Sequence, residues 1–444
     1  MARIAFYTLG CKLNFAETAT LARQLVAAGH VITDWEAPAD VYVLNTCAVT
    51  HQAERKAHKI LRQLHRRAPQ AKLVITGCYA QRAPEAFQNL PGVALVATNA
   101  QKPTLAQAIE ELIQHDVANP GLRGATEWAF WPSSSGEGRT RAFLKVQDGC
   151  DYRCSFCIVP KTRGPSRSAP PEAILQEVQR LAAAGFQEIV LTGINLGDYG
   201  KPHGIPFLEL LRRLEAEAPP TIRRFRLSSI EPNLLSDEVL DFVAAHPRWA
   251  PHFHLPLQSG SDRILRLMRR RYQRALYEGR IQAIRQRFPH AGIGVDVIVG
   301  FPSESEEDFR ETYRFLEELP VSYLHVFPYS ERPGTVAATL PGSVPWPERL
   351  ARSEALRLLS LQKKRTFAES CLGQVVQVLI EEEGEGLSEN YLRVQVPSAS
   401  AGEWLAVKLI GLGEDGLAVG LPLSSKPEIP TFAPHGTGGL ANGL

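Results

Sequence analysis

The first 120 residues alternate between short apolar runs and longer amphipathic segments. Three runs have the length and composition of β-strands: 3–10, 40–46 and 72–77. Each is followed by a helical pattern, over about 15–28, 51–67 and 80–88. Strand, helix and strand in this order predict parallel strands joined by right-handed crossovers. We therefore expect a Rossmann-like parallel α/β domain over residues 1–118.

The alternation resumes after a linker rich in glycine, proline and serine at 119–140, whose Trp128, Phe130 and Trp131 are expected to pack against a domain surface. Six strand-like runs follow: 142–147, 187–193, 222–229, 251–257, 292–300 and 321–328. Helical patterns lie between them: 171–184, 206–217, 235–245, 274–288 and 305–318. This order predicts a partial (β/α)6 barrel over 141–345, with its chemistry at the carboxyl ends of the strands.

The last part of the chain changes period again. A charged helical pattern covers 346–370 and is followed by three alternating runs, 375–380, 391–396 and 405–410. Short alternating strands predict a small antiparallel β-barrel over 371–423. Residues 424–444 are rich in proline and glycine and are predicted to be a mobile tail. The whole chain is thus expected to be an α/β protein of three domains.

Composition narrows the setting without naming a function. The chain has 444 residues and a net charge of +2, so any affinity for nucleic acid must come from a local patch. It shows no signal peptide and no apolar run long enough to span a membrane, and we expect a cytoplasmic protein. In that compartment cysteines more often bind metal or react than form disulfides.

Three of the seven cysteines lie in one short loop after the first predicted barrel strand. Cys150, Cys154 and Cys157 have the spacing C-x-x-x-C-x-x-C. Structural zinc uses four ligands, and no Cys or His follows within forty residues. A four-iron cluster held by three thiolates leaves one iron free for a small molecule, whereas an electron-transfer cluster has four. The spacing alone establishes a three-thiolate site.

Three further cysteines follow the three predicted N-terminal strands. Cys11, Cys47 and Cys78 each stand just after a strand, at equivalent places. Parallel strands end at one edge of a sheet, where open α/β sheets place their sites. A lone free cysteine is usually a small buried hydrophobe, but three at equivalent places indicate a second three-thiolate iron–sulfur site. Cys371 has no partner in the sequence.

The sequence around both trios resembles that of a known family. Residues 146–149 (VQDG) and 158–164 (IVPKTRG) flank the cysteine loop as in the radical S-adenosylmethionine enzymes, and within them the methylthiotransferases. Residues 8–14 (TLGCKLN), 45–50 (NTCAVT) and 77–81 (GCYAQ) are similar to that family's N-terminal domain. The C-terminal strands are similar to its TRAM domain, an OB-like RNA-binding module.

The resemblance implies two 4Fe-4S clusters and S-adenosylmethionine. The open iron at the 150–157 loop would bind S-adenosylmethionine, whose reductive cleavage gives a 5′-deoxyadenosyl radical. The second cluster would carry the sulfur to be inserted. Eight residues are implied to bind the cofactor, although each could instead be ordinary polar or apolar lining of a barrel: Phe156, Gly193, Asn195, Ser228, Glu231, Gln258, Asp296 and Val297.

Within the family, four segments look most like one branch: 10–14, 147–152, 191–197 and 252–260. That branch converts N6-threonylcarbamoyladenosine at position 37 of tRNA, beside the anticodon, to its 2-methylthio form. Its partners would be a tRNA anticodon loop and an electron donor such as flavodoxin or ferredoxin. Three alternatives stay open: isopentenyladenosine in tRNA, a ribosomal-protein aspartate, or a non-catalytic RNA-binding iron–sulfur redox sensor.

Two basic segments are candidates for phosphate contact. Arg55 and Lys56 lie on an amphipathic helix over 54–67, and Arg269, Arg270 and Arg271 lie in an arginine-rich stretch with few opposing acids. Arginine suits bidentate phosphate contact. Either segment could equally be a solvated helix face.

Overall fold

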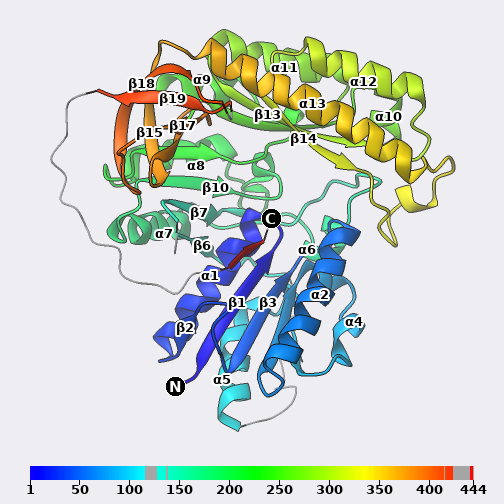
Figure 1. The fold of residues 1–444 in the computed structure, drawn as a ribbon, viewed down its shortest axis with the longest axis vertical. Coiled ribbons are helices and arrows are strands. Elements are labelled where there is room, and N and C mark those ends of the chain that lie inside the picture. The colour runs from blue at the N-terminus through cyan, green and yellow to red at the C-terminus, as the bar shows by residue number, and fades with distance from the viewer. Residues whose placement is uncertain (116–127, 137–138, 415, 424–440, 444) are drawn as a thin grey trace.

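The computed structural model describes residues 1–115, 128–136, 139–414, 416–423 and 441–443. Figure 1 shows three bodies: the N-terminal domain, the central domain that it packs against, and a small C-terminal barrel. Among the described residues no helix combines the length and apolarity needed to cross a membrane.

The N-terminal domain is the parallel α/β domain that the sequence predicts. Its sheet has the order β2-β1-β3-β4-β5, and all these pairs are parallel. The strands are β1 (Arg3–Leu9), β2 (Val31–Thr33), β3 (Val41–Thr46), β4 (Lys72–Gly77) and β5 (Val93–Val96). The helices are α1 (Lys12–Ala27), α2 (His51–Arg67), α3 (Cys78–Arg82), α4 (Glu85–Gln88) and α5 (Leu105–His115).

The central domain contains the six predicted parallel strands. They are β7 (Arg141–Lys145), β10 (Glu188–Thr192), β11 (Arg224–Leu227), β12 (His252–Gln258), β13 (Gly292–Val299) and β14 (Tyr323–Pro328). Two sheets, β11-β10-β7-β6 and β12-β13-β14, are joined by isolated bridges such as Ser229 to His254. The outer helices are α7 (Pro171–Ala183), α8 (Phe207–Glu217), α9 (Asp237–Ala245), α10 (Asp262–Leu267), α11 (Arg274–Arg287) and α12 (Glu306–Glu318).

The expected linker contains a strand. Ser133, Ser134 and Ser135 form β6, which pairs antiparallel with β7 and is buried against α1. Three serines carry no strand signal, so the neighbours decide this conformation. The ring of Trp128 lies against Arg167, and Lys145 lies over the Phe130 and Trp131 rings, as expected for aromatic packing. Residues 116–127 lie outside the described part.

The C-terminal body is the small barrel that the sequence predicts. It follows α13 (Trp346–Ser370), which runs beside β14 (Figure 1). Its strands close in the order β15-β16-β17-β19-β18: β15 (Val375–Glu382), β16 (Glu385–Ser388), β17 (Arg393–Gln395), β18 (Trp404–Leu412) and β19 (Ala418–Pro422). The barrel is not wholly antiparallel as expected, because β17 and β19 pair in parallel. Most of the predicted tail lies outside the described residues, but Ala441–Gly443 forms β20 beside β1.

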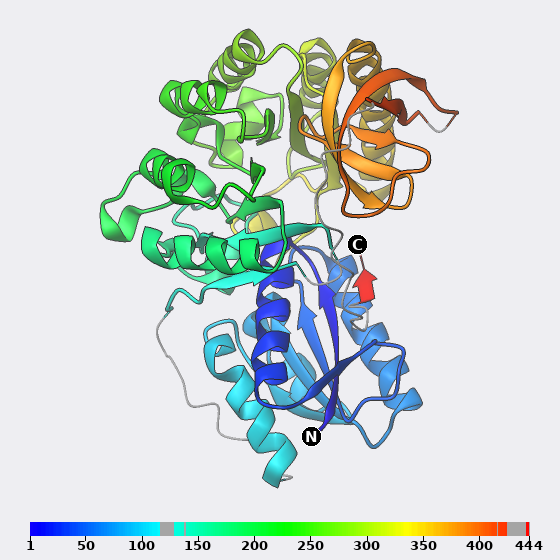
Figure 2. The same ribbon diagram turned by 90° about the vertical axis from the view of Figure 1, so that its left-hand side faces the viewer.

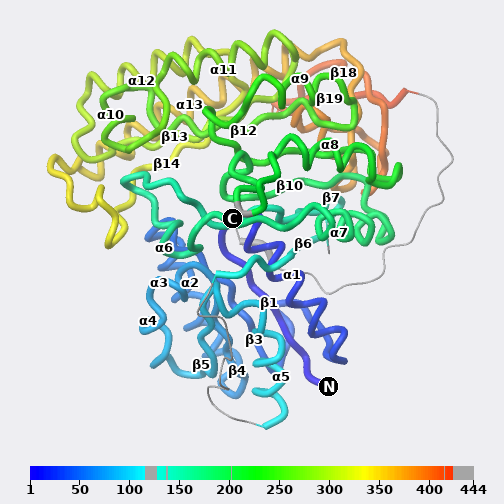
Figure 3. Tube along the Cα trace, turned by 180° about the vertical axis from the view of Figure 1, so that it is seen from behind, coloured from blue at the N-terminus to red at the C-terminus, as the bar shows by residue number. Residues whose placement is uncertain are grey.

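The barrel strands alternate between an apolar outer face and a polar inner face. On β13, Val295, Val297 and Val299 pack into the core under the helices, whereas Asp296 and Ile298 remain partly accessible. Figure 2, from the side, and Figure 3, from behind, show the N-terminal domain packed against the central domain. A polar interior is suited to a ligand rather than to core packing.

Candidate active site

The cysteine loop 150–157 leaves the barrel after β8 (Gln147–Asp148) through a turn that requires glycine. Gly149 has φ +68°, and a Cβ there would lie 1.9 Å from the Pro165 carbonyl oxygen. The Cys150 amide donates to Gly164 O at 3.1 Å, and the Cys157 amide donates to Cys154 O at 3.1 Å. These backbone contacts shape the loop that carries the three cysteines.

Arg270 lies against this loop. Its Nη1 donates to Cys154 Sγ at 3.1 Å, and its guanidinium forms an ion pair with Glu231. The Arg270 side chain is only 3% exposed. The prediction that Arg270 contacts RNA is therefore wrong for this structure, because a buried side chain committed to a thiol and a carboxylate offers nothing to a phosphate.

The N-terminal trio gathers at the carboxyl edge of the sheet, as its spacing predicts. Cys11 is the N-cap of α1, Cys47 follows β3, and Cys78 begins α3. A Cβ on Gly10 would lie 3.3 Å from Cys47 Sγ, so the loops carrying Cys11 and Cys47 touch. The thiols of Cys78 and Cys11 are both close enough to act electrostatically on Cys47.

Buried amides and a hydroxyl hold these three loops together. Asn14 Nδ2 donates to Leu9 O at 2.7 Å and to Thr46 O at 3.1 Å. Asn45 Nδ2 donates to Asn14 O at 3.0 Å, and Thr46 Oγ1 donates to Thr76 O at 2.6 Å. The residues beside the cysteines thus fix the strand ends on which the cysteines stand.

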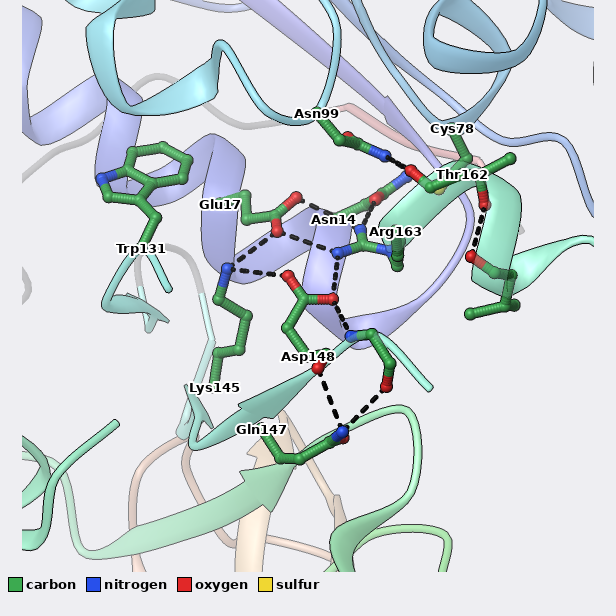
Figure 4. Close-up of polar contacts among 12 residues, drawn as sticks. Asn14, Glu17, Cys78, Asn99, Trp131, Lys145, Gln147, Asp148, Thr162 and Arg163 are labelled. Carbon is green, nitrogen blue, oxygen red and sulfur yellow. Dashed lines mark hydrogen bonds and ion pairs between the residues drawn. The ribbon is translucent and has the colours of Figure 1, made fainter. Parts of the chain in front are cut away.

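Helix α6 (Val159–Arg163) connects the two trios. It contacts α3, and Asn99 Nδ2 lies 3.5 Å from Cys78 Sγ and donates to Thr162 O at 2.8 Å. Arg163, at the end of α6, lies near enough to act electrostatically on Cys78 and Cys11. Figure 4 shows these residues converging from both domains.

Arg163 belongs to a buried ionic network across the domain interface (Figure 4). Its Nη1 lies 3.0 Å from both Glu17 Oε1 and Asp148 Oδ1. Lys102 Nζ and Lys145 Nζ lie 2.5 Å and 2.9 Å from the Glu17 carboxylate. Burial alone would raise the pKa of Glu17, but the surrounding cations hold it well below its usual range. The N-terminal domain and the barrel therefore share one set of charges.

Three of these cysteines would have to release protons in order to bind metal as thiolates. Burial raises the pKa of Cys47, Cys150 and Cys157 to about 12 in each case. Ligation requires the deprotonated form, so a cluster must displace those protons. This donor set, three cysteines at each site, fits the iron–sulfur chemistry expected from the spacing.

The geometry favours a cluster over a single zinc ion. Among the residues that the structure describes, only His254, Asp296 and His325 bring three His, Cys, Asp or Glu ligand atoms within 4.8 Å of one another. Tetrahedral zinc with Zn–S bonds of about 2.3 Å would hold sulfurs about 3.8 Å apart. Each cysteine trio is spread more widely than that.

The predicted cofactor residues partly meet at the strand ends beside the cysteine loop. Asn195 Nδ2 and Ser228 Oγ are buried and lack a hydrogen-bond partner within the described chain. A Cβ on Gly193 would lie 2.9 Å from Gln147 Oε1, which leaves no room for a side chain. Glu231 is paired with Arg270. Orphaned polar atoms of this kind fit a polar ligand such as S-adenosylmethionine.

The two apolar residues predicted to contact the cofactor, Phe156 and Val297, lie in different surroundings. Phe156 lies edge-on to Phe301 at 6.5 Å between centroids, beside the partly buried Ile298. Val297 points into the core beneath the helices and is fully buried, so its side chain cannot line the cofactor site. Because successive side chains of a strand point to opposite faces, the neighbouring Ile298 on β13 faces the barrel interior instead.

The barrel interior holds a polar group that the sequence only partly predicts. His254 Nε2 lies 2.9 Å from Asp296 Oδ1, and His254 Nδ1 lies 3.2 Å from Ser229 Oγ. His325 completes the group from β14. Asp296 was predicted, but the two histidines were missed. Their place on β12 and β14, the two strands that flank Asp296 on β13, was the available signal. Gln258 sits at a register shift with φ +71°.

The basic surface is smaller than the sequence indicates. On α11, Arg287 Nε lies 2.6 Å from Asp241 Oδ1 and Arg280 lies 3.3 Å from Asp237, both acids of α9. The expectation of few opposing acids is wrong, because those acids come from a neighbouring helix. Arg271 lies over the Tyr152 ring at 4.0 Å. Exposed arginines remain at three of the predicted positions: Arg55, Arg269 and Arg271. Lys56 is half-buried on α2.

Family models match two parts of the chain: the radical SAM superfamily over residues 144–316 and the uncharacterized protein family UPF0004 over residues 3–98. The threonylcarbamoyladenosine tRNA methylthiotransferase MtaB of Aquifex aeolicus is 41% identical over 398 residues, covering 88% of this chain and 96% of its own. The protein of the same name from Bacillus subtilis is 36% identical and covers 93% and 95%. A tRNA-2-methylthio-N(6)-dimethylallyladenosine synthase of Syntrophobacter fumaroxidans is 37% identical and covers 84% of each chain.

A solved structure shares the fold at low identity. The radical S-adenosylmethionine methyltransferase TsrM of Kitasatospora setae, with cobalamin and a 4Fe-4S cluster bound, has a TM-score of 0.56 and 17% identity. The match covers 76% of this chain and 77% of that one. It therefore supports the arrangement of the domains and not a shared reaction.

Proposed function

The chain belongs to the radical SAM tRNA methylthiotransferases, and from this we propose that it converts N6-threonylcarbamoyladenosine at position 37 of tRNA to its 2-methylthio derivative. The relatives with that name cover 88% and 93% of this chain. The observation that carries the proposal is the pair of three-cysteine sites, one on each side of a shared buried interface.

We assign Cys150, Cys154 and Cys157 to one 4Fe-4S cluster and Cys11, Cys47 and Cys78 to a second. With S-adenosylmethionine, these groups supply the radical chemistry and the sulfur for methylthiolation at C2 of the base. Asn195 and Ser228 would orient the cofactor through their unpaired polar atoms, and Phe156 with Ile298 would provide its apolar contact. Arg270 would hold Cys154 and Glu231 in place.

The tRNA would present its anticodon loop at the interface between the N-terminal domain and the barrel. Base recognition in loops commonly uses splayed bases stacked on aromatic or arginine faces, worth about 1–3 kcal/mol per base. The exposed Arg55 and Arg269 and the C-terminal barrel are candidates for backbone contacts, which would make binding strongly dependent on salt. A low-potential donor such as flavodoxin or ferredoxin would supply electrons.

The test separates the two trios. After anaerobic reconstitution, Cys154→Ser should lose S-adenosylmethionine cleavage and tRNA product, whereas Cys47→Ser should keep cleavage to 5′-deoxyadenosine and lose only the methylthio product. Each variant should retain about half of the wild-type iron. Cys371→Ser is the matched control, because Cys371 is buried in the core of the C-terminal barrel and should not affect either activity.

Mass analysis of the tRNA nucleosides identifies the substrate. A 2-methylthio product on threonylcarbamoyladenosine supports the proposal, whereas product only on isopentenyladenosine would reassign the enzyme to that branch. Full methylthiolation by Cys47→Ser would remove the second cluster from the proposal.

A further inference from the structure

We propose that the ammonium group of Lys12 binds the carboxylate of the threonyl group of the substrate, in a pocket whose polar wall is His254, Asp296 and His325. The inference rests on the proposed function and goes further, because it names the residue that recognises the substituent on the base. Among the predicted substrates, the threonylcarbamoyl group brings an anion and the isopentenyl group brings only hydrocarbon.

Lys12 is placed between the N-terminal trio and the barrel interior. It is the first residue of α1 and directly follows Cys11. The groups that act electrostatically on its ammonium come from several other elements. They are Tyr391 of the C-terminal barrel, Arg141 at the start of β7, Arg226 on β11 and Asp296 on β13. An anion held there would lie beside the cysteine edge of the N-terminal domain.

Arg141 and Arg226 each form an ion pair with a glutamate, whereas Lys12 does not pair with a carboxylate among the described residues. Arg141 Nε lies 2.8 Å from Glu381, and Arg226 Nε lies 2.9 Å from Glu188. No hydrogen bond and no carboxylate within 4.0 Å is found for the Lys12 ammonium in the part of the chain that the structure describes. An ammonium group surrounded by protein is costly unless it is paired.

The Lys12 side chain is neither sealed in the protein nor fully exposed. It lies deep among protein atoms, yet part of its surface stays accessible. Asp296 shows the same combination, and His325 is exposed on the edge strand β14. A positive charge from Lys12 is therefore accessible among polar groups that are also accessible.

The opposite wall suits the rest of the threonyl group. His254, held by Asp296 at 2.9 Å and Ser229 at 3.2 Å, and the nearby His325 offer ring nitrogens that can donate or accept. A threonylcarbamoyl group carries a hydroxyl and a urea-like amide in addition to its carboxylate. A site built for polar groups rejects a hydrocarbon substituent strongly, because its buried groups are then left unpaired.

The experiment compares two substrates on the wild type and three variants. Synthetic anticodon stem–loops carry either N6-threonylcarbamoyladenosine or its threonine primary amide, which lacks the charge but keeps the shape. Single-turnover rates and stem–loop binding are measured for wild type, Lys12→Met and Lys12→Arg, each loaded with clusters. Arg212→Met, which removes an exposed cation from α8, is the control.

We expect the wild type and Arg212→Met to bind the acid at least tenfold more tightly than the amide. Lys12→Met should bind both as weakly as the wild type binds the amide, and Lys12→Arg should restore part of the preference. Iron content and cleavage of S-adenosylmethionine without substrate should stay at wild-type levels in Lys12→Met, which separates recognition from damage to the neighbouring cluster.

Two results would overturn the inference and leave the proposed function standing: equal binding of acid and amide by the wild type, or an equal loss for both substrates in Lys12→Met. The cluster-loaded wild type could instead bind one Zn²⁺ per chain, and His325→Ala could abolish that binding. This result would show that His254, Asp296 and His325 form a metal site and do not bind the substrate. If the wild type modifies neither stem–loop while it cleaves S-adenosylmethionine, the proposed function itself fails and the inference fails with it.

Discussion

Gly77 stands immediately before Cys78 in a conformation that only glycine adopts readily, with φ +101° and ψ −171°. A Cβ there would lie 2.4 Å from both the amide nitrogen and the carbonyl oxygen of Thr46. We expect Gly77→Ala to lower the melting temperature and to displace Cys78 from Cys47. Iron per chain should fall by about half, as measured by iron analysis after anaerobic reconstitution.

Gly29→Ala is the matched control for this prediction. Gly29 has a similar φ of +90°, but nothing lies within 4 Å of the added Cβ. It should cost only the backbone penalty of about 1–2 kcal/mol and leave the iron content unchanged. Full iron in Gly77→Ala would show that the N-terminal trio does not depend on this close approach.

For single residues, the spacing along the sequence predicted which cysteines lie together, but the sequence did not predict which way individual side chains point. Cys11, Cys47 and Cys78 could be grouped because each follows a strand end, and the other trio could be grouped by its spacing within one loop. Val297 was misplaced because the choice between the two faces of a buried strand depends on what packs above it. Arg270 was misplaced because its partner Glu231 is 39 residues away in the chain.

Among the elements, β10 and β11 carry an ion cluster that attaches the C-terminal barrel. Glu188 accepts from Arg224 Nη1 and Arg226 Nε, both at 2.9 Å. These arginines in turn donate to the Gln377 and Ser388 carbonyl oxygens of the small barrel, at 2.6 Å and 3.1 Å. The carboxylate therefore organises the arginines that hold the next domain.

The second prediction concerns the pH dependence of this cluster. Burial would raise the pKa of Glu188, but Arg226, Arg224 and Arg141 outweigh it and lower the pKa to about 2. A lowered pKa contributes stability above the unfolded value of about 4.5, and this contribution is lost as the pH falls from there toward 2. Its size is on the order of 3 kcal/mol.

We expect Glu188→Gln to be destabilised at pH 6, as measured by urea unfolding of the metal-free protein. Its deficit relative to the wild type should shrink as the pH falls below about 4.5. Glu172→Gln, which removes a carboxylate from an exposed pair with Arg213, should behave like the wild type at every pH. If Glu188→Gln were destabilised by the same free energy at low pH, Glu188 would stabilise the protein through its shape and not its charge.

At the scale of elements, periodicity predicted most strands and helices, and its failures have a common cause. Ser133–Ser135 forms β6 because β7 and α1 cover it on both sides. The small-barrel strands β16 and β19 were missed because each is short and is defined by its neighbours in a closed barrel. Pairing partners distant in sequence supply the missing information in each case.

For the whole molecule, the interface between the N-terminal domain and the barrel carries an excess of positive charge. Four cations surround two carboxylates, which leaves two positive charges uncompensated within the network: Lys102, Lys145, Arg163 and Arg167 against Glu17 and Asp148. No sequence pattern could predict this network, because its members come from residues 17 to 167 and from two domains.

The third prediction rests on the two proposed clusters: their removal should loosen this interface. Metal-bound thiolates are anionic, whereas free thiols are largely neutral near pH 7. Arg163 lies close enough to Cys78 and Cys11 to act on them, so the loaded N-terminal trio supplies negative charge that the network lacks. Without it, cations confined to a buried site repel one another with less compensation.

Hydrogen exchange measured by mass spectrometry checks this. Chelator-stripped protein should exchange faster than cluster-loaded protein at α3 and α6, which contact each other across the interface. Exchange in β15 and β18 should not change, since the C-terminal barrel is attached through the separate cluster around Glu188. Arg163→Met removes the central charge and should shrink the difference between loaded and stripped protein at α3 and α6. If stripping accelerated exchange equally in all three domains, the clusters would be stabilising the fold generally, and the charge balance at this interface would not explain how the two sites are held together.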